Sequence, residues 1–162
     1  MPGERTKILV TGATGYIGGA VVDKFLARPD APSLDIRAVV RSPEKGEKLK
    51  AFGITPIIGS HDDEDLMVKA ASQVDVVLAM ADSDDLAAAK ATLKGLKKRF
   101  EETGKQPILI NTSGTGTLAD DAAGMYTTDT VYDDADPDQI ETLPYTKIHR
   151  DVDLEIVAAD KV

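Results

Sequence analysis

The sequence predicts a doubly wound α/β fold, in which a parallel five-stranded sheet with strand order 3-2-1-4-5 carries helices on both faces. Three observations lead to this prediction. Short apolar segments alternate strictly with helical patterns along residues 7–112. The apolar segments are nearly continuous, as in strands buried on both faces of a parallel sheet. A glycine-rich turn separates the first apolar segment from the first helical pattern.

The first five segments follow this alternation. Residues 7–11 are predicted as a strand because their centre is continuously apolar, and residues 15–28 as a helix because apolar residues recur there at helical spacing. The proline-rich segment 29–32 breaks the chain. Residues 35–40 are the second predicted strand, and the highly charged residues 43–52 are an exposed helix.

The third strand is predicted at residues 55–58, between a glycine and a Gly-Ser pair. Residues 61–72 form a short predicted helix, whose first turn is rich in acids that the helix dipole favours. Residues 74–80 are nearly all apolar and are predicted as the fourth strand. Such a continuous apolar run marks a strand that is buried on both faces, as in parallel sheets.

The most distinct helix is predicted at residues 83–102, which are rich in Ala, Leu and Lys. Ser83 and Asp84 suit its N-cap, and Gly104 suits its C-cap. The fifth strand follows at residues 107–112. Five strands and four helices in this order predict right-handed crossovers between parallel strands.

Residues 114–144 are expected to form a long loop, because they are rich in Gly, Asp and Thr and have no periodicity. The loop contains eight acids and neither Lys nor Arg, so it accounts for nearly all of the net charge of −9. Residues 145–160 return to helical spacing, with Ile148, Val152 and Ile156 in one stripe.

The composition excludes several kinds of function. A chain of 162 residues is expected to form one domain. It has no cysteine, and hence no disulfide, thiolate metal site or cysteine nucleophile. It lacks a membrane-spanning stretch, a signal peptide and a basic stripe for nucleic acid, so we expect a soluble cytoplasmic protein whose partners are small molecules.

No metal site is predicted. Aspartates alternate over residues 134–138 as at the start of a calcium loop, but Gln139 and Tyr145 stand where that loop needs Gly and Glu. The two histidines, His61 and His149, lack the spacing of metal ligands. Each is interpreted as structural or solvated.

The glycine-rich turn predicts a dinucleotide site. Gly12, Gly15 and Gly18 follow a G-x-x-G-x-x-G spacing between a strand and a helix, where a pyrophosphate rests on exposed N–H groups. Gly12 allows the tight turn, Gly15 lets the backbone approach the phosphates, and Gly18 lets the helix pack closely. The residues of this turn expected to contact the dinucleotide are Gly12, Thr14, Gly15, Tyr16, Ile17 and Gly18.

The cofactor preference depends on Arg41, at the end of the second strand, where an NAD site would typically have an acid. A guanidinium matches a 2′-phosphate, so NADP is favoured over NAD; the alternative is a solvated strand-end charge. Other residues expected to line the crevice are Ser60, His61, Met80 and Ala81. Ser113 ends strand five, where its hydroxyl can bond either a substrate carbonyl or the backbone.

The segment Thr11–Gly18, followed by Val39–Ser42, resembles the atypical and extended short-chain dehydrogenase/reductase superfamily. Within it, the chain is most similar to NmrA-like proteins and to fungal nucleoside-diphosphate-sugar epimerase-type proteins. Three further stretches support this resemblance: Asp75–Val77, Thr112–Gly116 and His149–Asp153. The resemblance implies a Rossmann fold that binds NADP(H) through the glycines and the arginine after strand two.

The chain departs from the pattern of this superfamily. The catalytic pair is Tyr-x-x-x-Lys, but Tyr145 is followed four residues later by His149, and Lys147 lies at another spacing. Strand three ends Gly59–Ser60 instead of Gly-Asp, which alters a contact to adenine. Ser113 and Tyr145 remain the expected catalytic hydroxyls.

The length is a second departure, because members of the group continue into a small C-terminal substrate domain. We therefore expect residues 1–162 to be the dinucleotide-binding domain alone, with residues 114–144 as an acidic loop. The edge of strand five would then be open to a second copy or to another partner chain.

Two functional hypotheses follow. The first is an NADP-dependent oxidoreductase or epimerase-like enzyme, or its cofactor-binding part, that acts on a small carbonyl or sugar-type substrate. The second is a non-catalytic NADP(H)-sensing regulator, whose loop at residues 114–144 changes order with the state of the cofactor. The absence of Tyr-x-x-x-Lys favours the second hypothesis.

Overall fold

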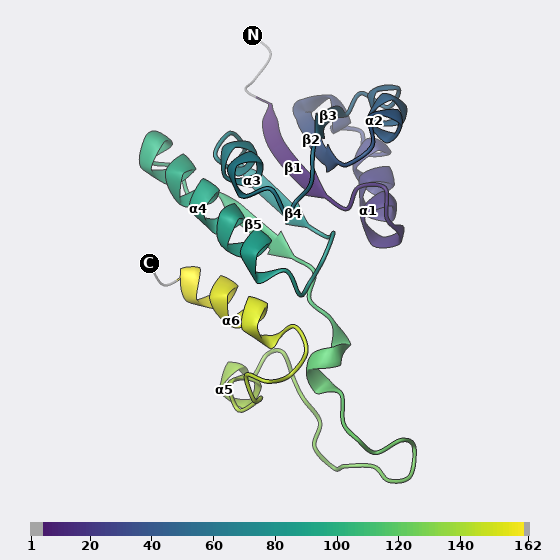
Figure 1. The fold of residues 1–162 in the computed structure, drawn as a ribbon, viewed down its shortest axis with the longest axis vertical. Helices are drawn as coiled ribbons and strands as arrows, with labels where there is room; N and C mark the ends of the chain where they lie inside the picture. The colour runs from purple at the N-terminus through teal and green to yellow at the C-terminus, as the bar shows by residue number, and fades with distance from the viewer. Residues whose placement is uncertain (1–4, 161–162) are drawn as a thin grey trace.

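Five parallel strands form one sheet in the order β3-β2-β1-β4-β5, so the predicted topology is confirmed (Figure 1). The computed structural model describes residues 5–160. The strands are β1 (Thr6–Thr11), β2 (Leu34–Val40), β3 (Thr55–Ile58), β4 (Val76–Ala79) and β5 (Ile108–Asn111). β1 lies at the centre and pairs with both β2 and β4.

Six α-helices are present in the described part of the chain. They are α1 (Tyr16–Leu26), α2 (Pro43–Lys50), α3 (Glu64–Ala71), α4 (Leu86–Thr103), α5 (Pro137–Glu141) and α6 (Arg150–Ala159), with short 3₁₀ turns η1 (Ala31–Ser33) and η2 (Thr115–Leu118). α1 and α2 pack on one face, and α3 and α4 pack on the other (Figure 1).

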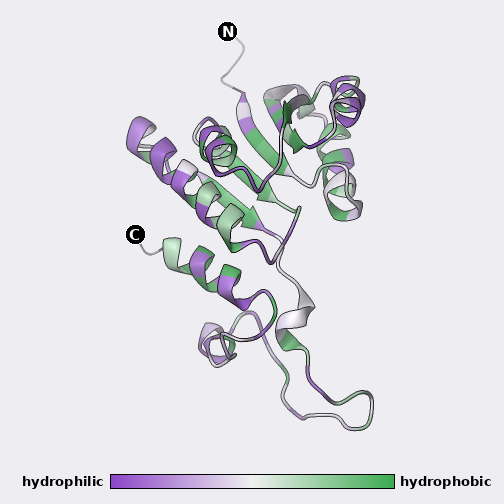
Figure 2. Ribbon diagram, in the orientation of Figure 1, coloured by the Kyte–Doolittle hydropathy of each residue, from purple (hydrophilic) through white to green (hydrophobic). Residues whose placement is uncertain are grey.

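The strands are apolar on both faces because each face is covered by helices. In β1, Ile8 and Val10 pack towards α1, whereas Leu9 points to the opposite face and packs with Met67 of α3. All four side chains are at most 4% exposed. Figure 2 shows apolar strands between helices whose outer surfaces are hydrophilic. The continuous apolar run of β1 thus reflects burial on both sides.

Side-chain caps decide where two helices begin. The helix predicted from residue 61 begins at Glu64, because Asp63 accepts a hydrogen bond from the backbone N–H of Leu66. The prediction of Ser83 and Asp84 as the N-cap of α4 is wrong, because Asp85 is the residue that caps this helix. The predicted C-cap of α4 is confirmed, since Gly104 adopts a left-handed conformation with φ of +67°.

The last helix is shorter than predicted. α6 begins at Arg150, because residues 145–149 form turns and His149 has a left-handed backbone with φ of +68°. Ile148 was expected in the packed stripe of this helix, but it precedes the helix and is 55% exposed. Val152 is buried, and α6 packs along α4.

The acidic segment 114–144 contains the turn η2 and the short helix α5, so it is not entirely a loop. Between these two elements the chain runs away from the sheet as an extended loop (Figure 1). Apolar side chains such as Met125 and Val131 are exposed there. β5 forms the edge of the described sheet, and its outward residues Ile108 and Ile110 are more than half exposed.

Candidate functional site

Two glycines of the turn after β1 are required by close backbone contacts. Gly12 has a φ of +74°, and a Cβ built there would lie 2.4 Å from the carbonyl oxygen of Met80. A Cβ at Gly18 would lie 2.1 Å from the carbonyl oxygen of Gly12. Both contacts are with rigid backbone, so no side chain fits at either position. The turn is therefore folded tightly against the start of the loop after β4.

The same turn leaves the N-terminus of α1 without a cap. The N–H of Gly15 donates to the carbonyl oxygen of Gly12 at 2.8 Å, but no side chain caps the helix and its first turn has no acid. The N–H groups of the first helical turn have no intrahelical acceptor. Among the α-helices of residues 5–160, α1 alone lacks both a side-chain cap and a first-turn acid. This arrangement can accept an anion.

Two aligned strands place Met80 and Ala81 beside this turn. The hydroxyl of Thr11, at the end of β1, accepts a hydrogen bond from the N–H of Met80 at 3.1 Å. Thr11 is 5% exposed, so this bond is shielded from solvent. The order of the sheet reverses between β1 and β4, which is where doubly wound folds bind their ligands.

Arg41 follows the C-terminal end of β2 and is exposed. No hydrogen bond or ion pair joins its guanidinium to another residue in the described part of the chain. The next residue, Ser42, caps α2 and fixes the direction of the backbone. Arg41 is thus a cation held at the rim of the crevice and free to meet an anionic group.

Asp62 lies near this cation. The hydrogen bond from the Ser60 hydroxyl lowers the pKa of Asp62, and the attraction of His61 and, more weakly, of Arg41 lowers it further. Ser60 and Asp62 are 2.9 Å apart, from hydroxyl oxygen to carboxylate oxygen. The side chains of Ser60 and His61 therefore turn towards carboxylates, and a contact with a dinucleotide through them stays a prediction.

Ser113 and Tyr145, the two predicted catalytic residues, differ in their surroundings. The hydroxyl of Ser113 donates to a carboxylate oxygen of Asp153, in the first turn of α6, at 2.9 Å. Tyr145 lies on a turn before α6 and is 76% exposed. Because residues 145–149 are not helical, Tyr145 and His149 do not lie one turn apart on a helix, as a Tyr-x-x-x-Lys pair would.

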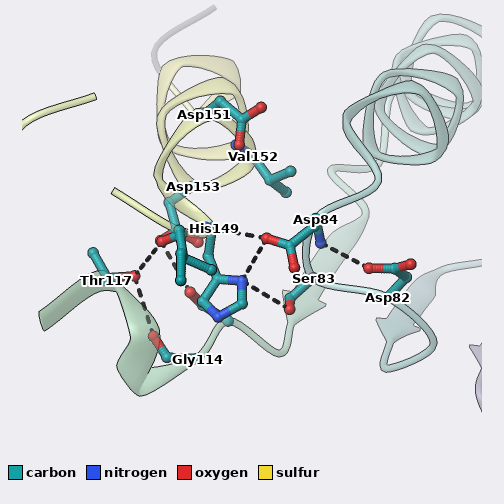
Figure 3. A network of polar contacts seen from close by, with 11 residues as sticks. Asp82, Ser83, Asp84, Gly114, Thr117, His149, Asp151, Val152 and Asp153 are labelled. Carbon is teal, nitrogen blue, oxygen red and sulfur yellow. Dashed lines mark hydrogen bonds and ion pairs between the residues drawn. The ribbon is translucent and has the colours of Figure 1, made fainter. Parts of the chain in front are cut away.

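His149 forms a polar network that sequence reasoning missed (Figure 3). Nδ1 of His149 lies 2.7 Å from a carboxylate oxygen of Asp84 and 3.0 Å from the hydroxyl of Ser83. The backbone N–H of His149 also donates to Asp84. The ring packs on Gly114, where a Cβ would lie 2.5 Å from Nε2. His149, which follows the acidic segment, thereby links Gly114 at the start of that segment to the loop after β4. No motif signals a contact between residues 65 positions apart.

The crevice also has a small hollow beneath its rim. It has a volume of about 20 Å³ and is lined by Thr11, His61, Asp85 and Asn111, among others. His61 and Asp85 are mostly buried, with 21% and 19% of their side chains exposed. The hollow is large enough for about one water molecule or ion.

Comparisons with known proteins agree with this geometry. The sequence profile described as "NmrA-like family" matches residues 4–97, more than half of the chain. Oxidase ucsJ from Acremonium sp is 34% identical over 114 residues, covering 69% of this chain and 32% of the relative. Eugenol synthase 1 from Petunia hybrida is 34% identical over 108 residues, covering 60% of this chain and 35% of the relative.

A solved structure shows the same similarity. The NADPH-dependent quinone oxidoreductase QOR2 from Escherichia coli, complexed with NADPH, has a TM-score of 0.51 and 27% sequence identity, covering 65% of this chain and 36% of that one. The aligned part spans about a third of the length of these relatives. None of the helices among residues 5–160 combines the length and apolar character needed to cross a bilayer.

Proposed function

Since the chain belongs to the NmrA-like family, we propose that it binds NADP(H) and serves as the cofactor-binding part of a reductase or epimerase-like enzyme. The resemblance predicted from the sequence is confirmed by the family match. The relatives include proteins named as reductases, such as isoflavone reductase homolog P3 from Arabidopsis thaliana. The substrate class we propose is a small carbonyl or sugar-type compound.

One observation carries the proposal: the uncapped N-terminus of α1 above a turn that only glycine can form. Exposed N–H groups and the positive end of the helix dipole suit a pyrophosphate. The residues proposed to hold the dinucleotide are Gly12, Thr14, Gly15, Tyr16, Ile17, Gly18, Arg41, Ser60, His61, Met80 and Ala81. Tyr16 is 97% exposed, so its side chain leaves the turn accessible.

Arg41 supports NADP over NAD. Its guanidinium lies at the end of β2, the position from which the adenosine ribose is read in this fold. Among the residues that the structure describes, no acid is hydrogen-bonded to Arg41. A 2′-phosphate would outcompete the weak attraction of Asp62, because it carries more charge and accepts bidentate hydrogen bonds.

The chemistry assigned to the chain itself is orientation of a carbonyl and movement of a proton, while bound NADPH would supply the hydride. Ser113 can polarise a substrate oxygen only by redirecting the hydroxyl that it now donates to Asp153. The exposed hydroxyl of Tyr145 is the second proposed contact. Without a lysine four residues later, Tyr145 lacks the neighbour that lowers the tyrosine pKa in related enzymes.

The test is consumption of NADPH by the purified chain with a panel of small aldehydes, ketones and nucleotide sugars. We expect turnover that falls in Ser113→Ala and Tyr145→Phe, with Tyr126→Phe as a control in the exposed acidic segment. Unchanged turnover in Tyr145→Phe would remove this tyrosine from the mechanism. Binding of NADPH without turnover of any compound would favour the alternative below.

The alternative is a non-catalytic NADP(H)-sensing regulator. It is favoured by the position of Tyr145 outside α6 and by His149, which is bound to Asp84 and Ser83 in place of a catalytic lysine. In this role, the acidic segment 114–144 changes its order with cofactor and meets a protein partner. The alternative predicts that NADP alters the rate of proteolysis within residues 114–144, and an unchanged rate contradicts it.

A further inference from the structure

Three metal-ligating side chains meet at the rim of the crevice: His61, Asp62 and Asp85. His61 Nε2 lies 3.2 Å from Oδ1 of Asp62 and 3.6 Å from Oδ2 of Asp85. One ligand atom from each residue lies within 4.8 Å of the other two. His61 and Asp62 follow β3, whereas Asp85 caps α4, so the fold joins residues from two separate loops.

The carboxylates are held so that one oxygen of each faces the imidazole. Asp85 uses Oδ1 to accept the N–H of Ala88 at 2.9 Å, which leaves Oδ2 towards His61. Asp62 uses Oδ2 to accept the hydroxyl of Ser60, which leaves Oδ1 towards His61. Neighbouring groups that orient ligands in this way are typical of metal centres.

Direct hydrogen bonding does not account for the whole cluster. A separation of 3.6 Å between His61 Nε2 and Asp85 is too long for a hydrogen bond. Ligands bound at about 2.0–2.2 Å to one ion lie about 2.8–3.6 Å apart, the shorter values in octahedral and the longer in tetrahedral geometry. The two distances from Nε2 fall within this range.

There is also room for one ion beside these side chains. The hollow of about 20 Å³ is lined by His61 and Asp85, and Asp82 lies on the same lining. Asp62 is exposed on the outer side, where solvent would complete the coordination.

We propose that His61, Asp62 and Asp85 bind a divalent first-row transition metal ion, with Zn²⁺ preferred over Mg²⁺. One imidazole nitrogen and two carboxylate oxygens suit Zn²⁺, Co²⁺ or Mn²⁺, whereas Mg²⁺ favours an all-oxygen shell. The ion would tie the end of β3 to the start of α4, and both border the dinucleotide crevice.

The composition of the chain makes the test direct. There is no cysteine, and His61 and His149 are the two histidines, so imidazole ligation can be assigned by two substitutions. The experiment titrates the metal-free chain, without dinucleotide, with Co²⁺ by visible absorption and with Zn²⁺ by calorimetry. We expect one equivalent of each ion to bind, with coordination bands in the cobalt spectrum and no response to Mg²⁺ at equal concentration.

Four variants locate the site. His61→Asn, Asp62→Asn and Asp85→Asn should each weaken Zn²⁺ binding by more than the ~10–100-fold typical of losing a supporting contact. Asn still caps a helix, so Asp85→Asn should keep α4 folded. The matched control is His149→Asn, because asparagine tolerates the left-handed backbone at that position and should leave Zn²⁺ affinity unchanged.

Two results would overturn the proposal. One is Zn²⁺ affinity in His61→Asn equal to that of the parent chain, which would place the ion elsewhere. The other is equal affinity for Mg²⁺ and Zn²⁺, which would indicate attraction to exposed acids without imidazole ligation. Both metal affinities are measured without dinucleotide, so their outcome does not depend on whether the chain binds NADP(H).

Discussion

The end of the sheet where the strands begin (the amino edge) and the end where they finish (the carboxyl edge) differ in how their polar groups are paired. At the amino edge, Asp75 accepts the backbone N–H of Lys7 at 2.9 Å and the guanidinium of Arg99 at 2.7 Å. At the carboxyl edge, the first turn of α1 has neither a cap nor an acid. Asp75 is therefore paired at the amino edge, whereas the first turn of α1 has no side-chain partner at the carboxyl edge.

We infer from this difference that the amino edge serves the stability of the fold and the carboxyl edge serves ligand binding. Burial tends to raise the pKa of Asp75, but the hydrogen bonds from Lys7 and Arg99 outweigh it and hold that pKa below its ordinary value. Such a paired carboxylate stabilises the fold. Gly12 and Gly18 bury no side chain, and they allow the backbone at the carboxyl edge to pack closely. Local departures from the best folding choices are expected at functional sites.

The largest effect is expected at the carboxyl edge. Gly18→Ala places a Cβ 2.1 Å from the carbonyl oxygen of Gly12, so the turn must move. We expect NADPH binding to fall below detection in calorimetry. The free energy of unfolding should fall by about 1–3 kcal/mol, as in other overpacked sites. NADPH affinity equal to that of the parent chain would contradict the account.

A control separates loss of the site from loss of stability. Gly53 also has a left-handed backbone, with φ of +78°, but no atom lies within 4 Å of a Cβ built there. Gly53→Ala should therefore cost about 1–2 kcal/mol of stability from backbone strain alone. Its NADPH affinity should be unchanged, although its stability falls by a similar amount.

A smaller effect on NADPH affinity is expected from substitution of Arg41, the cation at the carboxyl edge. Arg41→Gln removes the charge that we assign to the 2′-phosphate, so affinity for NADPH should fall about 10–100-fold, the equivalent of one charged hydrogen bond or two. Affinity for NADH should change little. Lys45→Gln, one turn into α2, is the control and should leave both affinities nearly unchanged. An equal loss for NADPH and NADH would contradict the assignment of Arg41.

The smallest effect is expected at the amino edge. Asp75→Asn should lower the free energy of unfolding by about 1–2 kcal/mol through weaker hydrogen bonds, without altering NADPH affinity. Because folding lowers the pKa of Asp75, its contribution to stability is present above the unfolded pKa of about 3.9 and is lost as the pH falls through the folded pKa. Chemical denaturation should therefore show a difference in the free energy of unfolding between the parent chain and Asp75→Asn that narrows below about pH 4.

The control for this pH dependence is Asp30→Asn. Asp30 pairs with Arg28 on the surface, and both side chains are more than half exposed. Solvent screens such pairs, so no measurable change in stability is expected at any pH. A gap for Asp75→Asn that is constant from neutral to acidic pH would show that its carboxylate charge does not stabilise the fold.

Much of the body of the fold could be predicted from the sequence. The strand order and β3 follow from the alternation of apolar segments with helical patterns, and the two glycines that pack closest against backbone atoms, Gly12 and Gly18, follow from their spacing. These signals are local or repeat along the chain. The starts of the helices were predicted less accurately. Several acids precede α4, and the sequence does not show which of them accepts the helix N–H as Asp85 does.

The rest depends on contacts between distant residues. His149 meets Asp84 across 65 positions, and His61 meets Asp85 across two loops. Neither pair has a motif, so both histidines were interpreted without partners. The helix predicted from Tyr145 begins at Arg150, because the chain first makes the left-handed turn that brings His149 to Asp84. Sequence periodicity carries no information about that contact.

The most direct test of the central claim is calorimetric titration of the purified 162-residue chain with NADPH and, separately, with NADH. We expect one dinucleotide per chain, with NADPH bound more tightly than NADH because of Arg41. Equal affinity for the two would contradict the role of Arg41, and the absence of binding by either would contradict the assignment of the α1 N-terminus as a dinucleotide site.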